Sequence, residues 1–218
     1  MGISNQASGF RPGVCTSTTR PSAPYKGQVI FETDTDRLYV WNGSAWVIPN
    51  SPAQNPGGLE LVKTDTITSG NSKEITGCFS STYNNYKIVV DNLKADSVQT
   101  VQMLLGTTTS SVYFWSGHYV PFGQGIVTAS AMNSTVIDTG GVSSSDVICT
   151  GTIEFQNPNN ATATGFQCLM VDPRTSGSTN ARYYSGFVNN TTQYTSFTLK
   201  LTGGAFTSCN ISVYGYRK

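Results

Sequence analysis

Apolar and polar residues alternate along the chain from residue 59 onward. The clearest case is FTLKLT, in which Phe197, Leu199 and Leu201 alternate with polar residues. Since successive side chains of a strand point to opposite faces, this period of two predicts half-buried β-strands. The predicted strands cover residues 59–66, 86–90, 100–105, 112–119, 147–155, 165–171, 182–188, 196–202 and 210–216. Short strands separated by polar turns are typical of a β-sandwich or a jelly roll, so we expect an all-β fold.

A second pattern lies in GQVIFETDTDRLYVWNGSAWV, residues 27–47, which has two apolar faces. One face carries Val29, Phe31, Leu38 and Val40, and the other carries Ile30, Tyr39 and Trp41. Asp-Thr-Asp and Asn-Gly between the apolar runs predict tight turns, so we expect a small β-meander. Chains shorter than about 40 residues usually need cross-links, metals or oligomerisation to be stable. We therefore expect other chains to cover this meander.

The composition along the chain predicts four segments. Residues 1–26 are rich in Gly, Pro, Ser and Thr and are predicted to be an extended arm. Residues 27–48 form the meander, which we interpret as an attachment and trimerisation module. Residues 49–58 contain three prolines and two glycines and are predicted to be a linker. Residues 59–218 form the β-sandwich, which we expect to be jelly-roll-like.

Charge and cysteine content exclude several classes of protein. Only 11% of the 218 residues are charged, and no Lys or Arg occurs between Lys94 and Arg174. Nucleic-acid binding needs clustered cations, so we do not expect it. The five cysteines lack the spacing of a metal or redox motif, and buried thiols are a better interpretation than disulfides. No signal peptide and no membrane-spanning run is predicted.

The residues available for catalysis are few. His118 is the sole histidine, it lies among aromatic residues, and no nucleophile-elbow motif accompanies it. The carboxylates that a glycosidase would need are widely spaced along the chain; the candidates are Asp138, Asp146, Glu154 and Asp172. We therefore expect no enzyme activity, no cofactor and no metal.

The stretch VYFWSGHYVPFGQG, residues 112–125, concentrates aromatic residues with few charges. Aromatic faces stack on sugars and form binding hot spots, so this stretch is a candidate receptor or glycan site. Its candidate contact residues are Tyr113, Trp115, His118, Tyr119 and Phe122. The alternative is that one face of this strand belongs to the core and the remaining residues seal a subunit interface.

The N-terminal segment resembles a module of bacteriophage virion proteins. The matching stretches are TSTTRP at 16–21, GQVIFETDT at 27–35 and WNGSAW at 41–46. The stretches GLELVKTDTITSG, FSSTYNNYKIVV and SVYGYRK are also similar to parts of tail-fibre-like and minor structural proteins. The resemblance implies a virion protein with a jelly-roll-like domain that is often trimeric.

These observations predict a short homotrimeric tail fibre or adhesin, assembled in the bacterial cytoplasm and located in the virion. It would contact other tail or capsid proteins and a host surface glycan, without inserting into a membrane. The residues expected to trimerise or anchor it are Val29, Phe31, Leu38, Val40, Trp41 and Trp46. One alternative is a capsid cement, decoration or head-fibre protein whose arm clamps the capsid. A third is an enzyme that degrades polysaccharide.

Overall fold

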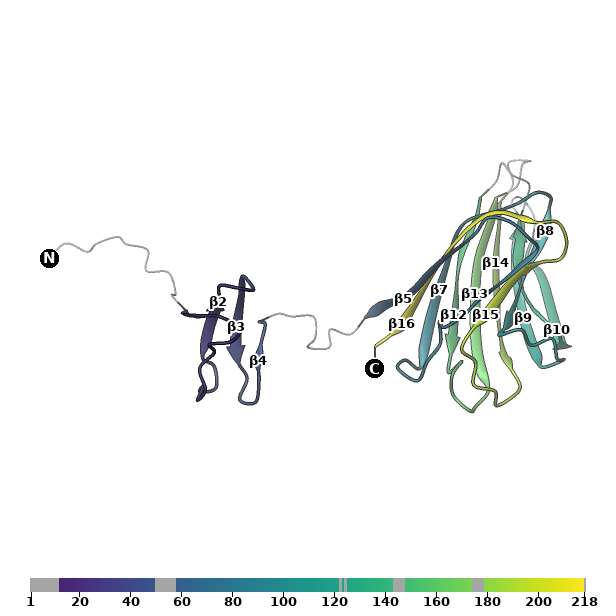
Figure 1. The fold of residues 1–218 in the computed structure, drawn as a ribbon. Coiled ribbons are helices and arrows are strands. Elements are labelled where there is room, and N and C mark those ends of the chain that lie inside the picture. The colour runs from purple at the N-terminus through teal and green to yellow at the C-terminus, as the bar shows by residue number, and fades with distance from the viewer. Residues whose placement is uncertain are drawn as a thin grey trace. The chain divides into compact units, whose positions relative to one another are not determined.

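The computed structural model describes residues 12–49, 58–121, 123, 125–142, 148–173 and 179–217. All regular structure in these residues is β-strand, arranged in three sheets, so the expected all-β class is confirmed (Figure 1). The chain divides into two compact units, Met1–Pro56 and Gly57–Lys218.

The first unit contains one four-stranded sheet. Its strands in spatial order are β1 (Gly13–Cys15), β2 (Val29–Glu32), β3 (Arg37–Trp41) and β4 (Trp46–Val47). Strand β1 runs parallel to β2, and the other pairs are antiparallel. The turn before β3 contains Asp36 with φ 57°, a left-handed conformation that Asp tolerates better than most residues. In the next turn, Asn42 Oδ1 accepts hydrogen bonds from the backbone N–H groups of Ser44 and Ala45.

The second unit contains an eight-stranded and a four-stranded sheet. The eight-stranded sheet has the order β10-β9-β14-β13-β12-β7-β16-β5, and the four-stranded sheet has the order β11-β8-β15-β6, with antiparallel neighbours throughout. The strands are β5 (Leu59–Ile67), β6 (Ser72–Ile75), β7 (Asn85–Ala95), β8 (Gln99–Leu105), β9 (Tyr113–Pro121), β10 (Val127–Ser134), β11 (Ile137–Val142), β12 (Cys149–Gln156), β13 (Thr164–Pro173), β14 (Thr179–Val188), β15 (Phe197–Leu201) and β16 (Phe206–Tyr216).

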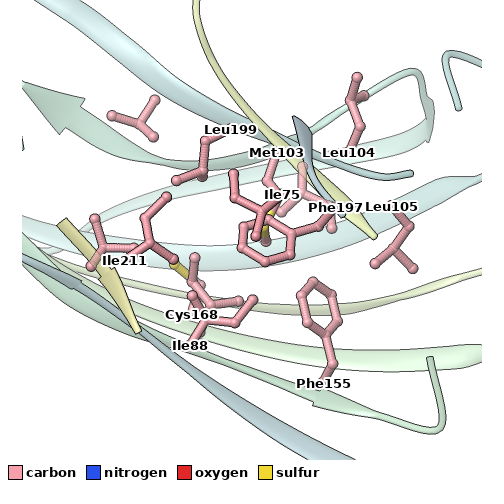
Figure 2. Close-up of a cluster of buried hydrophobic side chains, with 14 of the residues drawn as sticks. Ile75, Ile88, Met103, Leu104, Leu105, Phe155, Cys168, Phe197, Leu199 and Ile211 are labelled. Atoms are coloured by element: carbon pink, nitrogen blue, oxygen red, sulfur yellow. The ribbon is translucent and has the colours of Figure 1, made fainter. Parts of the chain in front are cut away.

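The hydrophobic core of this unit lies between its two sheets. Phe197 and Leu199 of β15 meet Ile88, Phe155 and Cys168 of the larger sheet, and all five are at most 1% exposed (Figure 2). This arrangement is that of a β-sandwich, in which the inner faces interdigitate to form the core. The side of the eight-stranded sheet that points away from this core is called the outer face below.

Each of the nine strands predicted for this unit overlaps an observed strand. The prediction is too short for β7, which continues to Ala95 and not to residue 90, and for β16, which begins at Phe206 and not at residue 210. The alternation around residues 197–201 also has the predicted sense, since Phe197, Leu199 and Leu201 are buried. Three further strands were not predicted: β6, β10 and β11. Strand β10 reads VTASAMNS and β11 reads IDTGGV, so small and polar residues conceal their period of two.

Four of the five cysteines are buried, as their interpretation as small hydrophobic residues predicts. They are Cys78, Cys149, Cys168 and Cys209, and all five thiols are free. Burial raises the pKa of Cys78, Cys149 and Cys209 to about 12, because the thiolate would lose its hydration. Cys15 lies in β1 and is partly exposed.

Candidate functional site

One face of the first unit is covered by the chain's own N-terminal segment. Arg20 reaches across the sheet, forms an ion pair with Glu32 and lies 4.8 Å from the centroid of the Tyr39 ring. Thr35 Oγ1 donates a second hydrogen bond to Glu32, 2.9 Å from Oε2. The Arg20 guanidinium holds the pKa of Glu32 below its usual range. Beneath these contacts Ile30 is 1% exposed, so this side of the sheet has a small core of its own.

The opposite face of this sheet is apolar and open. The register pairs Val29 with Val40 and Phe31 with Leu38, and directly paired residues share a face. The edge strands extend the same face, since Val47 pairs with Val40 and Val14 pairs with Phe31. None of these side chains is fully buried, and Val14 is 63% exposed. We call this surface the open apolar face; its residues are Val14, Val29, Phe31, Leu38, Val40 and Val47.

The structure separates the six residues expected to trimerise or anchor the protein into two groups. Val29, Phe31, Leu38 and Val40 lie together on the open apolar face. Trp41 and Trp46 pair with each other on the covered face, with ring centroids 5.5 Å apart in an edge-to-face arrangement. The two tryptophans therefore contribute to the packing of one chain.

The aromatic stretch forms strand β9, and its alternation sends the predicted contact residues to both sides of the sheet. Tyr113 is fully buried. Its hydroxyl accepts a hydrogen bond from the backbone N–H of Leu105 and donates one to the carbonyl of Thr108, both at 3.0 Å. Tyr113 is thus a core residue, and its hydroxyl holds the segment after β8 in place through Leu105 and Thr108.

Trp115 and Tyr119 also point inward. Trp115 Nε1 donates to the carbonyl oxygen of Val136 at 3.2 Å, and the Tyr119 ring lies beneath the Arg182 guanidinium at 4.6 Å. His118 alone among the described candidates projects from the outer face, 5.9 Å from the ring of Tyr183. Phe122 lies outside the described residues.

The outer face carries aromatic residues that are not among the predicted contact residues. Phe114 of β9 and Phe187 of β14 stack with centroids 5.0 Å apart and planes 2° from parallel. Phe187 and Tyr183 are 44% and 39% exposed. The period of two in β9 was a usable signal for Phe114, since it places that residue opposite Tyr113. The partnership with Phe187 depends on the pairing of β9 with β14, which no local pattern specifies.

A polar cluster lies on the inner side of the same strands. Arg182 Nη2 is 3.5 Å from Asp172 Oδ2, and the guanidinium also bonds to the Tyr184 hydroxyl. Asp138 of β11 is near this pair, and its Oδ1 is buried without a hydrogen-bond donor among the described residues. Burial raises the pKa of Asp138, and the charge of Arg182 opposes that effect.

The structure brings two of the four glycosidase candidates together, since Asp138 and Asp172 both lie beside Arg182, and it separates Glu154 from them. Glu154 of β12 belongs to the outer face, where it pairs with Lys87 at 3.3 Å and accepts a hydrogen bond from Tyr216. Asp172 and Asp138 lie on the inner side, and Asp146 is outside the described residues. Among the residues described, no group of His, Cys, Asp and Glu is arranged to hold a metal. In the same part of the chain, no helix is long and apolar enough to cross a membrane.

Comparison with protein-family models, with curated proteins and with solved structures found no match for this chain.

Proposed function

We propose that this chain is a non-enzymatic structural protein of a bacteriophage virion, a short trimeric tail fibre or adhesin. Its first unit would anchor it, and its sandwich would face the host surface. The observation that carries the proposal is the open apolar face, an uncharged surface that spans all four strands of a small sheet. The resemblance of residues 16–46 to a phage virion module supports the assignment to a virion.

The trimer is proposed because the described residues of the first unit, 12–49, leave the open apolar face uncovered. Burying one such side chain contributes roughly 1.5–3 kcal/mol. Phe31 and Leu38 sit opposite each other in the middle of the face, so three copies around an axis would bury a continuous apolar core. Arg20 and Glu32 occupy the other side of the sheet, which leaves the apolar side for neighbouring chains.

We further propose that the sandwich is jelly-roll-like. The chain passes repeatedly between the two sheets, since β6, β8, β11 and β15 belong to one and the strands between them to the other. Such crossings between antiparallel sheets are the general plan of jelly rolls.

The alternatives receive less support from the geometry. A capsid clamp needs an extended arm, predicted at residues 1–26. Residues 1–11 lie outside the described residues, and in the described part β1 pairs with β2 of its own chain and Ser17 bonds to Asp34. A polysaccharide-degrading enzyme needs two carboxylates that a substrate can reach. Of the clustered pair, Asp138 and Asp172, Asp172 is 2% exposed and bonds to Arg182, and Glu154 lies on the opposite side of the sheet.

Light scattering on the purified protein tests the trimer. We expect wild type to have three times the mass of one chain, and Phe31→Asp to have the mass of one chain. The matched control is Tyr25→Asp, because Tyr25 is 71% exposed and lies outside the strands. A monomeric wild type, or a Phe31→Asp variant that stays trimeric, would contradict the proposal.

Gold-labelled antibody on intact virions tests the location. Label at the tail supports the fibre, and label over the head transfers the proposal to the decoration alternative. Virions that carry no label at all would overturn the assignment to a virion.

A further inference from the structure

The register of the eight-stranded sheet arranges the outer face into rows that run across the strands. A phenyl row consists of Phe114 and Phe187. The next row along the strands, the hydroxyl row, consists of Ser130, Ser116, Ser185 and Gln167. A third row, the tyrosine row, consists of His118, Tyr183 and Leu169. Neighbouring rows are two residues apart, or about 7 Å. A strip of hydroxyl and amide groups therefore lies between two rows that carry rings.

The phenyl row is open on the side of β13. The partner of Phe187 on that strand is Gly165, so no side chain of β13 stands beside the ring. The side chain of Gln156 lies over Gly165, where a Cβ atom would come within 2.5 Å of Gln156 Oε1. An amide thus lies next to an exposed phenyl ring. Phe187 is 44% exposed although it stacks on Phe114, so much of its ring remains available to a ligand.

Two open hollows adjoin along β9 and β10, and both include Ser116 and Ser130. One extends to Phe114 and Phe187 and has a volume of about 420 Å³. The other extends to His118 and Thr128 and has a volume of about 550 Å³. Both volumes fall within the range of small-molecule sites. The shared serines make the two hollows suitable for successive units of one extended ligand.

The four strands that carry these rows present no charged side chain on the outer face. The outward positions of β10, β9, β14 and β13 hold no Lys, Arg, Asp or Glu, and Arg182 and Asp172 point to the inner side. The first charges beyond the end of the hydroxyl row are Glu154 of β12 and Lys87 of β7, which pair with each other. Lys and Arg side chains, which make the strong charge-assisted bonds to phosphate, sulfate or carboxylate groups, do not occur at these outward positions. The surface therefore suits a neutral ligand.

We propose that this surface binds a neutral polysaccharide across β10, β9, β14 and β13. The apolar faces of its sugar rings would pack on Phe187 and Tyr183, and its hydroxyl groups would bond to the hydroxyl row. Tyr183 Oη already donates to Gln167 Oε1 at 3.4 Å, so the two rows are linked. This inference rests on the proposed function, since it names the class of receptor. A second copy of the chain is a less suitable occupant, because cores of subunit interfaces are apolar and this face has a polar row at its centre.

Saturation-transfer NMR on the full chain tests the proposal. The probes are the methyl glycosides of glucose, galactose, mannose and N-acetylglucosamine, with methyl glucuronoside as the anionic probe. We expect saturation of at least one neutral probe, and an at least fivefold loss of that signal in Phe187→Ala. Tyr214→Ala is the matched control. Tyr214 lies on β16, beside Lys87 and three strands beyond the end of the hydroxyl row, so its loss should leave the signal unchanged. Ser116→Leu, which fills the hollows without removing a ring, should abolish the signal as well.

Several results would overturn the inference. These are no saturation of any neutral probe, an equal signal from the glucuronoside, or an unchanged signal in both Phe187→Ala and Ser116→Leu. A change in the light-scattering mass of Phe187→Ala would assign the face to subunit contact instead. A wild-type protein that is trimeric but binds no neutral sugar would contradict only the proposed class of receptor. A wild-type protein that is monomeric and binds a neutral sugar would contradict only the proposed trimer.

Discussion

The two units of the chain bury their apolar side chains in different ways. In the sandwich, two sheets face each other, and Phe155, Phe197 and their neighbours are shielded entirely by the same chain. In the N-terminal unit there is one sheet, and Ile30 is the only fully buried hydrophobic residue among those described. Its opposite face, around Phe31, stays open. On one side of this sheet the ion pair between Arg20 and Glu32 provides the cover that a second sheet provides in the sandwich.

This difference indicates where assembly can act on stability. A unit that encloses its core within one chain gains stability from that burial independently of protein concentration. A unit with an open apolar face gains stability when a second surface covers that face, and this gain depends on concentration. The variants below alter one unit at a time, so that the contrast can be measured directly.

The largest effect is expected from Phe197→Ala. Phe197 is fully buried between the sheets and lies 5.9 Å from the ring of Phe79. Removing such a ring costs about 3–5 kcal/mol in the free energy of unfolding. Urea denaturation should show this loss for the sandwich, while the exciton signal of the Trp41–Trp46 pair in circular dichroism is unchanged. Loss of both signals together would show that the units do not fold independently.

A smaller effect is expected from Tyr113→Phe. The change removes one hydroxyl and leaves the buried N–H of Leu105 without its acceptor. An unsatisfied buried polar group costs about 1–3 kcal/mol, which urea denaturation can measure. Sugar saturation should stay at the wild-type level, because Tyr113 faces the core. A variant of normal stability that loses sugar binding would instead place Tyr113 in the site.

Asp138→Asn is expected to stabilise the sandwich by about 1 kcal/mol at pH 7. The folded-state pKa of Asp138 is raised by burial, so its ionised form destabilises the native state as the pH rises through that pKa. Below the unfolded pKa of about 3.9 both variants carry a neutral side chain, and the difference should vanish. Urea denaturation at pH 7.5 and at pH 3.5 checks both statements. An equal gain at the two values would mean that charge is not the cause.

The smallest effect is expected from Glu32→Gln, because only the N-terminal sheet responds. The folded-state pKa of Glu32 is lowered by Arg20, so its contribution is present above the unfolded pKa of about 4.3 and is lost as the pH falls through the folded pKa. The Trp41–Trp46 signal of wild type should therefore decrease in acid. The variant should show a weaker signal at pH 7 and a flatter pH profile. Identical pH profiles of wild type and Glu32→Gln would show that the ion pair between Arg20 and Glu32 does not stabilise this sheet.

The sequence predicted the strands of the sandwich well because their apolar positions recur with a period of two. Cys209, Ile211 and Val213 are an example, since burial of that face is decided within a single strand. Strand β10 escaped prediction because Thr128, Ser130 and their neighbours show no contrast between its two faces.

The candidate site was predicted less well, for a physical reason. The composition of residues 112–125 indicates an aromatic surface but does not say which side of β9 is the core. Tyr113 and Trp115 took the inner side, and Phe114 took the outer one. The partners of Phe114 and Ser116 on the outer face come from β14, which is distant in sequence. The pairing of β9 with β14 is set by the order of strands in the whole sheet, so it cannot be predicted from the sequence of β9 alone.

The buried thiols of the sandwich have a consequence for the environments that the protein can occupy. Cys78, Cys149 and Cys209 are enclosed, and burial raises the pKa of each to about 12, so the small thiolate fraction that an exposed thiol has at neutral pH is reduced further. Since the thiolate is the form that exchanges and oxidises, these groups are protected in both reducing and oxidising surroundings. The sandwich can therefore fold in surroundings rich in glutathione and remain folded in surroundings rich in oxygen, with these three thiols free in both.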